Sequence, residues 1–272
     1  MLNEGFKGWY FKHQGRDGTV AFIPGRSKGG AFVQMLTDNG SRQYDLPVLE
    51  EGKGEIRVGD CRFSSGGCHI DLPDVRGDIS FGPLCRLRSD IMGPFSHLPM
   101  QCRHGVISMG HDLRGGLKID GRPVSFDGGR GYIEMDSGRS FPRSYLWVQC
   151  NDFQPACSLM LSIAHIPFGL FSFRGCICAI IWQGRGYRLA TYSGVRILDP
   201  GPEHVALRQG GLKLDLWITP GDEGHKLSSP VAGRMDGTIR ESHNASLRAC
   251  LKKDGEVIFD LTGGRASFEY VL

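Results

Sequence analysis

The sequence has few of the features that mark helical, membrane-spanning or nucleic-acid-binding proteins. No stretch shows a sustained helical period of apolar residues, which argues against a helical bundle. The longest apolar run, Cys176 to Trp182, is far too short to span a bilayer as a helix. No run of five like charges occurs, and a formal net charge of +3 with a pI near 8.4 is too small to indicate nucleic acid or an anionic membrane as a partner.

The sequence also lacks the signatures of secretion and of metal binding. Met1 to Gly5 contains no basic segment followed by an apolar one, so we expect no signal peptide, a cytoplasmic location and reduced thiols. The close pair Cys176 and Cys178 has no second Cys or Cys/His pair at zinc spacing, which favours buried thiols over a metal site. Three histidines likewise lack partners at ligand spacing: His165, His204 and His225.

What the chain has in quantity is turn residues and short strands. Forty glycines and 14 prolines punctuate segments of alternating or apolar character, and this spacing is typical of an antiparallel meander. A short helix is weakly indicated near Pro47 to Glu51, and the prolines of Gly82 to Gln101 indicate a loop. Further strands are predicted at Arg103 to His111, Gly116 to Ile119 and Gly169 to Phe173, among others, and a loop at Pro220 to His225.

About twenty short strands with almost no helix predict an all-β protein made of two antiparallel barrels or sandwiches side by side. A length of 272 residues is enough for two such domains, each with its own core. The turn at Gly138 is the best candidate for the crossing point. The predicted domains are therefore an N-terminal β-barrel at residues 1–138 and a C-terminal β-barrel at residues 139–272.

The segment from Gly128 to Asn151 concentrates the chemistry of the chain. Within it, strand alternation places Tyr132, Glu134 and Asp136 on one face, so the two carboxylates share a side. Spacing alone favours a structural reading, because structural ion pairs outnumber catalytic carboxylates. In that reading the carboxylates pair at a barrel rim with nearby arginines, namely Arg130, Arg139 or Arg143.

A second strand follows a turn and Pro142. Alternation there places Tyr145, Trp147 and Gln149 on one face and Leu146, Val148 and Cys150 on the other. If this aromatic and amide face and the carboxylate face look into one cavity, the result is an acid in an aromatic-lined pocket.

Three blocks of the sequence resemble the tocopherol cyclase family and, more distantly, lipocalin-like carotenoid hydratases. They are Gly8-Trp9-Tyr10-Phe11-Lys12, the stretch Gly131 to Asn151, and Ser229-Pro230 through Gly233, Met235, Ile239 and Glu241. In the middle block the matching positions are Gly131, Tyr132, Glu134, Gly138, Phe141, Pro142, Trp147, Gln149 and Asn151. Met135 stands where the family usually has lysine, and Ser137 where it has tryptophan.

This resemblance implies two lipocalin-like units and a tocopherol cyclase-like isomerase. An isoprenoid quinol would close its phenolic oxygen onto an alkene of its own tail, with a protonated carboxylic acid in a dry site as proton donor and no cofactor. Glu134 is the expected acid and Asp136 its hydrogen-bonding neighbour or alternate acid. The expected substrate-binding residues are Trp9, Tyr132 and Trp147 as pocket wall, and Gln149 and Asn151 as partners of the ring hydroxyls. Core filling is an equal alternative for Trp9.

Two other functions stay open. Met135 and Ser137 favour a non-catalytic lipocalin-like module that binds an apolar isoprenoid, and water in place of the phenol would make the protein an alkene hydratase. In each case the expected partner is an apolar small molecule and not nucleic acid, and the oligomeric state is open. Transient contact with a membrane surface would supply such a ligand, and Pro83 to Pro99 is the candidate apolar entrance.

Overall fold

The computed structural model describes residues 5–168 and 171–272, and the predicted all-β fold is confirmed. Met1 to Glu4, on which the signal-peptide prediction rests, lie outside the described residues. Two compact units are present: a first unit of Met1–Arg88, Cys102–Phe141 and Lys226–Thr238, and a second unit of Ser89–Gln101, Pro142–His225 and Ile239–Leu272. The predicted ranges 1–138 and 139–272 stay a prediction. No helix among the described residues has the length and apolar character needed to cross a bilayer.

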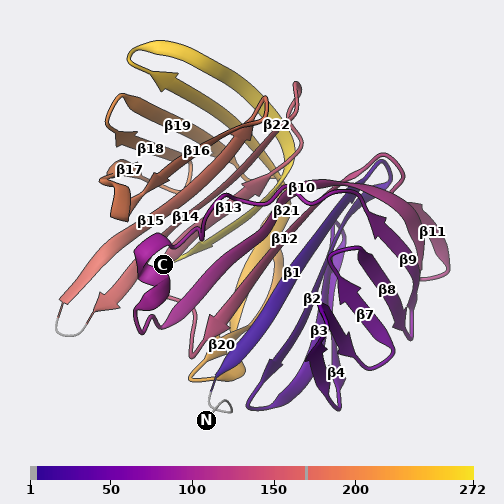
Figure 1. The fold of residues 1–272 in the computed structure, drawn as a ribbon. Coiled ribbons are helices and arrows are strands. Elements are labelled where there is room, and N and C mark those ends of the chain that lie inside the picture. The colour runs from indigo at the N-terminus through magenta and orange to yellow at the C-terminus, as the bar shows by residue number, and fades with distance from the viewer. Residues whose placement is uncertain (1–4, 169–170) are drawn as a thin grey trace. The chain divides into compact units, whose positions relative to one another are not determined.

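The first unit is built on an antiparallel sheet with the order β4-β3-β2-β1-β12-β10-β9-β8-β7-β6-β5, and β11 pairs with β10 (Figure 1). Its central strands β1, β12 and β10 come from the two ends of the segment, so the sheet joins residues more than 100 positions apart. The strands are β1 (Phe6–Gly15), β2 (Gly18–Ser27), β3 (Gly30–Thr37), β4 (Gly40–Leu46), β5 (Leu49–Gly52), β6 (Glu55–Val58), β7 (Cys61–Ser64), β8 (Gly67–Leu72), β9 (Val75–Phe81), β10 (Cys102–Ile119), β11 (Arg122–Ser125) and β12 (Arg130–Gly138).

The core of the first unit is formed by alternate residues of these strands. On β1 the side chains of Trp9 and Phe11 enter the core, and Phe22, Phe63 and Ile133 join them from β2, β7 and β12. Because nearly every strand contributes to this one cluster, the sheet curves around it, as in a lipocalin-like unit. The opposite face of the central strands carries the polar residues described below.

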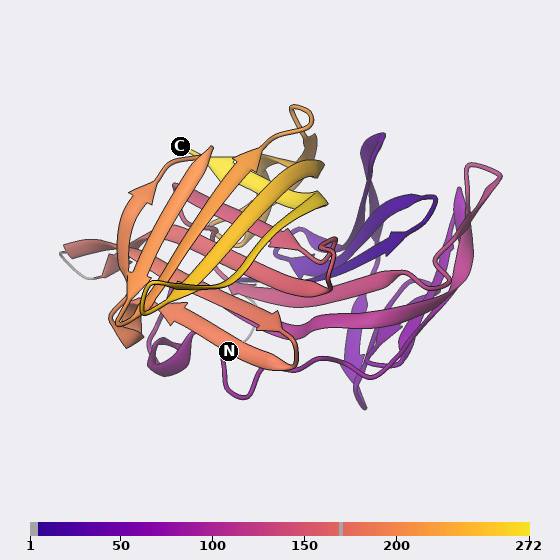
Figure 2. The ribbon, with the colours of Figure 1, turned by 90° about the horizontal axis from the view of Figure 1, so that it is seen from above.

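A second antiparallel sheet, most of which belongs to the second unit, has the order β16-β15-β14-β13-β22-β21-β19-β18-β17, and β20 pairs with β21. Its later strands are the orange and yellow ones in Figure 2. From Lys226 to Thr238, β20 and the start of β21 belong to the first unit. The strands of this sheet are β13 (Tyr145–Cys150), β14 (Cys157–Phe168), β15 (Phe171–Trp182), β16 (Arg185–Ala190), β17 (Arg196–Pro200), β18 (His204–Gln209), β19 (Leu212–Thr219), β20 (His225–Val231), β21 (Arg234–Lys253) and β22 (Glu256–Val271). Two short 3-10 helices are η1 (Gly93–His97) and η2 (Thr191–Ser193). Leu146, Val148 and Cys150 enter the core, as their alternation predicts.

The structure corrects several details of the sequence prediction. Residues 47–51 form no helix, because Lys53 and Gly54 adopt positive φ angles of 52° and 78° and make a hairpin turn that pairs β5 with β6. The predicted loop at Gly82 to Gln101 holds η1. The two strands predicted at 103–111 and 116–119 are one strand, β10, whose register shifts near Ser108. Of the strand predicted at 169–173, residues 169 and 170 lie outside the described residues, and β15 begins at Phe171.

Strand β20 was missed by the sequence analysis. Pro230 lies inside it, and proline argues against a strand from sequence alone. A hairpin turn with positive φ at Ala232 and Gly233 nevertheless pairs β20 with β21. Backbone bonds to the loop after β12 also hold it, since Phe141 N donates to the Pro230 carbonyl over 3.2 Å.

All nine cysteines are free thiols, in agreement with the prediction. Cys176 and Cys178 lie on one face of β15 and enter the core of the second unit. Burial raises the pKa of the Cys176 thiol to about 12, so this thiol is protonated and unreactive near neutral pH. The close pair is therefore core packing rather than a ligand set.

Two buried histidines belong to the core side of the first unit. His13 is fully buried with its ring centroid 5.5 Å from that of Phe81, and the His111 ring lies 4.6 Å from Phe81 on the other side. Burial, together with the nearby His111, lowers the pKa of His13 to about 3. Burial and then the positive Arg130 lower the pKa of His111 to about 4.

Because of these two histidines, we expect the free energy of unfolding to fall in acid. Because their folded-state pKa values lie below 6.5, the unfolded chain binds more protons than the folded one between pH 6.5 and 4, and stability falls as the pH falls. At pH 4.5 we expect each histidine to cost about 2–3 kcal/mol of unfolding free energy relative to pH 7. Chemical denaturation across this range measures the loss. His111→Gln should flatten the profile and the exposed His165→Gln should not; equal slopes in both variants would contradict this assignment.

Candidate functional site

The face of β12 that points away from the first-unit core carries the predicted carboxylates. The Tyr132 hydroxyl donates a hydrogen bond of 2.6 Å to Glu134 Oε2, and both side chains are buried. Asp136 follows on the same side, two residues further along the strand. The prediction that Tyr132, Glu134 and Asp136 share a face is thus confirmed.

His104 on β10 joins the two carboxylates. Its Nδ1 lies 3.0 Å from Asp136 Oδ1 and its Nε2 lies 3.5 Å from Glu134 Oε2. The antiparallel register of β10 and β12 explains this placement, because His104 stands directly opposite Asp136. Tyr132, Glu134, Asp136 and His104 are called the acid cluster below.

The sequence also allowed a purely structural role, in which the two carboxylates form ion pairs with nearby arginines. The His104 imidazole lies near both carboxylates, and it is a positive partner when protonated. Arg130, one of the arginines considered, bonds Asp112 Oδ1 through Nη1 over 2.6 Å, so the alternative is wrong for that residue. An imidazole has two ring nitrogens that can contact two carboxylates at once, and here Nδ1 faces Asp136 and Nε2 faces Glu134.

The side chains of the cluster are largely shielded from water. The Glu134 side chain is 7% exposed and that of His104 14%, while Asp136 at 22% is closest to water. Burial and then the adjacent Glu134 charge hold the pKa of Tyr132 well above its usual value. Tyr132 is therefore a hydrogen-bond donor to Glu134 and not a base. In the same way, burial and Asp136 hold the pKa of the Cys102 thiol well above its usual value.

Strand β1 supplies further side chains to this face. Tyr10 stands opposite Glu134 and Lys12 opposite Tyr132 in the antiparallel register, so they lie on the same side of the sheet. Both are buried, Lys12 to 1% exposure. Tyr10 and Lys12 were not among the residues predicted for the site, because only the pairing of β1 with β12 brings them next to Glu134 and Tyr132.

The assignment of Trp9 as a wall of the acid's pocket is corrected by the same register. Trp9 stands opposite Met135, on the core face of the sheet, and it packs in the first-unit core. The alternation of a strand separates it from Glu134, and Tyr10 occupies the position next to the acid. Trp9 therefore lies on the other face of the sheet from Glu134.

The acid cluster could also hold a metal ion. His104, Glu134 and Asp136 each offer a ligand atom, and these atoms lie within 4.8 Å of one another. Imidazole and carboxylate ligands suit first-row divalent ions. No local spacing in the sequence indicates such a group, because the three residues come from two strands about thirty positions apart.

In the second unit, β13 places the other predicted binding residues. Trp147 and Gln149 lie on the face opposite the core residues Leu146 and Val148, as predicted, and both are buried. Gln149 Nε2 donates a hydrogen bond of 2.8 Å to Asn151 Oδ1. This bond fixes the orientation of two amides that could donate to or accept from a polar ligand. That the Glu134 and Trp147 faces look into one cavity stays a prediction.

A buried ionisable pair on β21 was missed by the sequence analysis. His243 Nε2 lies 3.1 Å from Glu241 Oε1, and both residues are 1% exposed. Glu241 belongs to the third block of the resemblance, but only as a matching position. In the sheet it stands opposite Glu269 of β22, whose Oε2 accepts a bond of 2.5 Å from the Tyr145 hydroxyl.

No protein-family model and no curated protein matches the sequence. The fold is similar to several solved structures. CghA in complex with Sch210972 is 12% identical with a TM-score of 0.63, over 99% of this chain and 89% of that one. A candidate AttH protein of Nitrosomonas europaea is 12% identical with a TM-score of 0.57, over 98% and 92%. Kievitone hydratase of Nectria haematococca is 11% identical with a TM-score of 0.54, over 99% and 89%. At such low sequence identity these similarities show only that the fold is shared, and not the function.

Proposed function

We propose that the chain is an acid catalyst that transfers a proton to an alkene of an apolar, isoprenoid-type ligand and closes a ring, in the manner of a tocopherol cyclase-like isomerase. The observation that carries the proposal is the buried Glu134, held by the Tyr132 hydroxyl and backed by His104. Burial of a carboxyl group disfavours its charged form, and a neutral carboxylic acid is the species that can donate a proton.

Each residue of the acid cluster has its own role in the proposed reaction. Glu134 transfers its proton to one alkene carbon, which leaves a cation on the other, and the phenolic oxygen bonds to that cation. The phenol proton then returns to the Glu134 carboxylate, so substrate and product are isomers. The Tyr132 bond stabilises the carboxylate formed in between, and His104 with Asp136 offers a path for proton exchange.

The two departures from the family pattern leave this chemistry intact. Met135 packs against the first-unit core, on the opposite side of β12 from Glu134, and strand alternation gives Ser137 the same side. The substitutions therefore remove no group from the acid's face. Trp147, Gln149 and Asn151 are proposed as substrate-binding residues in the second unit, the tryptophan as an apolar surface and the amides as partners of ring hydroxyls.

Hydration of an isolated alkene is the second candidate, because one solved structure of the same fold is by name a hydratase. The same proton donor would serve, with water as the nucleophile in place of the phenol. Ligand binding without turnover is the third outcome, and the reaction products separate all three.

A prenylated quinol incubated with the protein in deuterium oxide and oxygen-18 water is expected to give a product with one carbon-bound deuterium and no oxygen-18. Protonation of the alkene by an exchangeable acid requires the deuterium, and internal capture by the phenol excludes solvent oxygen. Mass spectrometry with NMR of the isolated product measures both labels. Incorporated oxygen-18 would indicate a hydratase, and quinol recovered unchanged would indicate a binding protein.

A further inference from the structure

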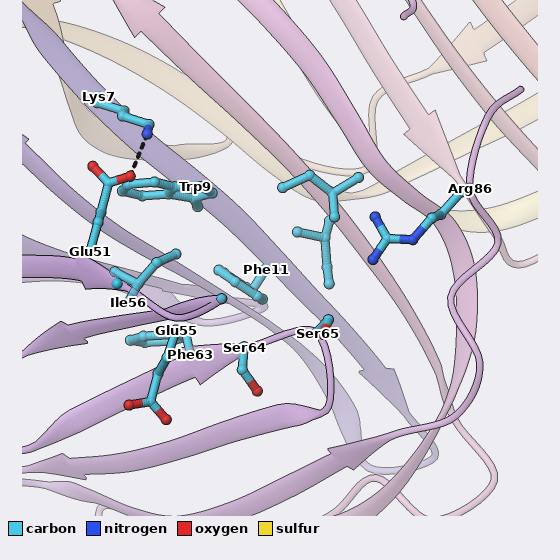
Figure 3. A pocket seen from close by; sticks show the side chains of 14 residues that line it. Lys7, Trp9, Phe11, Glu51, Glu55, Ile56, Phe63, Ser64, Ser65 and Arg86 are labelled. Atoms are coloured by element: carbon cyan, nitrogen blue, oxygen red, sulfur yellow. Dashed lines mark hydrogen bonds and ion pairs between the residues drawn. The ribbon is translucent and has the colours of Figure 1, made fainter. Parts of the chain in front are cut away.

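The first unit contains a second hollow, on the opposite side of its sheet from the acid cluster. A pocket of about 340 Å³ opens between β1, β5, β6, β7, β10 and β12 (Figure 3). Small-molecule sites typically measure about 300–1,000 Å³, so this pocket lies at the lower end of the range. It suits a short chain or a single ring rather than a long prenyl tail.

The walls of this pocket are apolar. Trp9 and Phe11 line it from β1, with Ile56 and Phe63 opposite them on β6 and β7 (Figure 3). Ile133 lines it from β12, one position from Glu134 but on the other face of the strand. A ligand here would be in contact with aromatic and aliphatic side chains and not with the acid cluster.

The charged residues of the pocket lining are balanced in sign, with Lys7 and Arg86 against Glu51 and Glu55. Glu51 is bound by two cations, since Lys7 Nζ lies 2.5 Å from Oε2 and Arg26 Nη2 lies 3.0 Å from Oε1. Lys7 also lies over the Trp9 ring, 4.5 Å from its centroid. The Glu51 carboxylate is therefore compensated by two cations.

Arg86 reaches the pocket from the segment after β9, on the other side from Lys7 (Figure 3). Within residues 5–168 and 171–272 its guanidinium enters no ion pair. The other acidic residue of the lining, Glu55, is bonded to Arg57 Nε over 2.5 Å. A planar guanidinium that has no carboxylate partner and faces an apolar pocket is suited to bind a ligand carboxylate.

We propose that this pocket binds a small amphipathic carboxylate, with its hydrocarbon part against Trp9 and Ile56 and its carboxylate at Arg86. The site is separate from the proposed catalytic site and does not depend on it. Octanoate is a suitable probe, and octanol is its uncharged match with the same chain.

Calorimetric titration of the full-length protein is expected to show octanoate bound more tightly than octanol, with the difference shrinking at high salt. Arg86→Gln should weaken octanoate binding about fivefold and leave octanol unchanged, because the exposed guanidinium contributes a partly screened charge pair. Arg88→Gln, which removes the same charge two residues away and outside the lining, should leave both unchanged. Equal affinities of the two probes, or undiminished octanoate binding by Arg86→Gln, would overturn the anion site.

The location is tested by filling the hollow. Ile56→Phe and Ile107→Phe add volume from two different strands, and each should abolish binding of both probes in protein whose melting temperature shows it to be folded. Retained binding in both folded variants would overturn the pocket as the site. Glu134→Gln should bind octanoate as the parent does, so loss of turnover and loss of this binding are separate results.

Discussion

Glu134→Gln is expected to reduce product formation by roughly 10²- to 10⁴-fold, the range that a positioned general acid contributes. Glutamine has the size of glutamic acid, and its amide oxygen can still accept the hydrogen bond from Tyr132, so the folded structure should persist. What is lost is the proton that adds to the alkene. Single-turnover conversion of a prenylated quinol to its cyclised product measures the change, and thermal denaturation shows whether the fold is kept.

Two matched variants sharpen this experiment. Asp136→Asn keeps Glu134 and removes only the charge at 3.0 Å from His104 Nδ1, so we expect a smaller loss together with an altered pH profile. Glu256→Gln makes the same chemical change at an exposed position of β22 and should be silent. Turnover by Glu134→Gln at the parent rate would remove Glu134 from the mechanism.

The local part of the acid cluster could be predicted from the sequence, because strand alternation is a property of neighbouring residues. The period of two places Tyr132, Glu134 and Asp136 together without any knowledge of the fold. The same rule explains the correct assignment of Trp147 and Gln149 to one face of β13.

The partner of the carboxylates could not be predicted in this way. His104 meets Asp136 only through the pairing of β10 with β12, and a sheet register between strands about thirty residues apart leaves no local trace in the sequence. Trp9 shows the converse error. Trp9 was expected at the wall of the acid's pocket, but in the register of β1 and β12 it is Tyr10, one position along β1, that stands opposite Glu134.

Local sequence patterns also gave the wrong secondary structure for two segments in which a turn determines the strand pairing. The segment around Pro47 reads as a weak helix, yet the positive φ angles at Lys53 and Gly54 close a hairpin and make β5 a strand. Residues of poor β propensity can form a strand when a turn of this kind places them beside a neighbouring strand, with which they then form hydrogen bonds. β20 with its internal Pro230 is a second case.

Gly131→Ala is expected to destabilise the protein strongly, on the order of 3 kcal/mol, although it adds one methyl group. Gly131 stands opposite His111 in the register of β12 and β10, and a Cβ at position 131 would lie 2.2 Å from His111 Nε2. The ring cannot move away freely, since its Nδ1 is bonded to the Ser108 hydroxyl over 3.0 Å and its other side meets Phe81. The strain would therefore be transmitted to β12, one residue from Tyr132.

Equilibrium unfolding of single and double variants tests this account. Gly105→Ala is the matched control on β10, because its Cβ would meet only Met135 at an ordinary 3.8 Å, and it should change stability by less than about 1 kcal/mol. His111→Ala should itself cost stability but should cancel most of the additional cost of Gly131→Ala, which a double-mutant cycle measures as a favourable coupling. If the losses of unfolding free energy in the two single variants simply add in the double variant, the glycine is required for a reason other than its contact with the His111 ring. A favourable coupling between the two substitutions would explain why a glycine precedes Tyr132 and Glu134 in β12. Only a residue without a side chain lets His111 of β10 approach the strand that carries the acid.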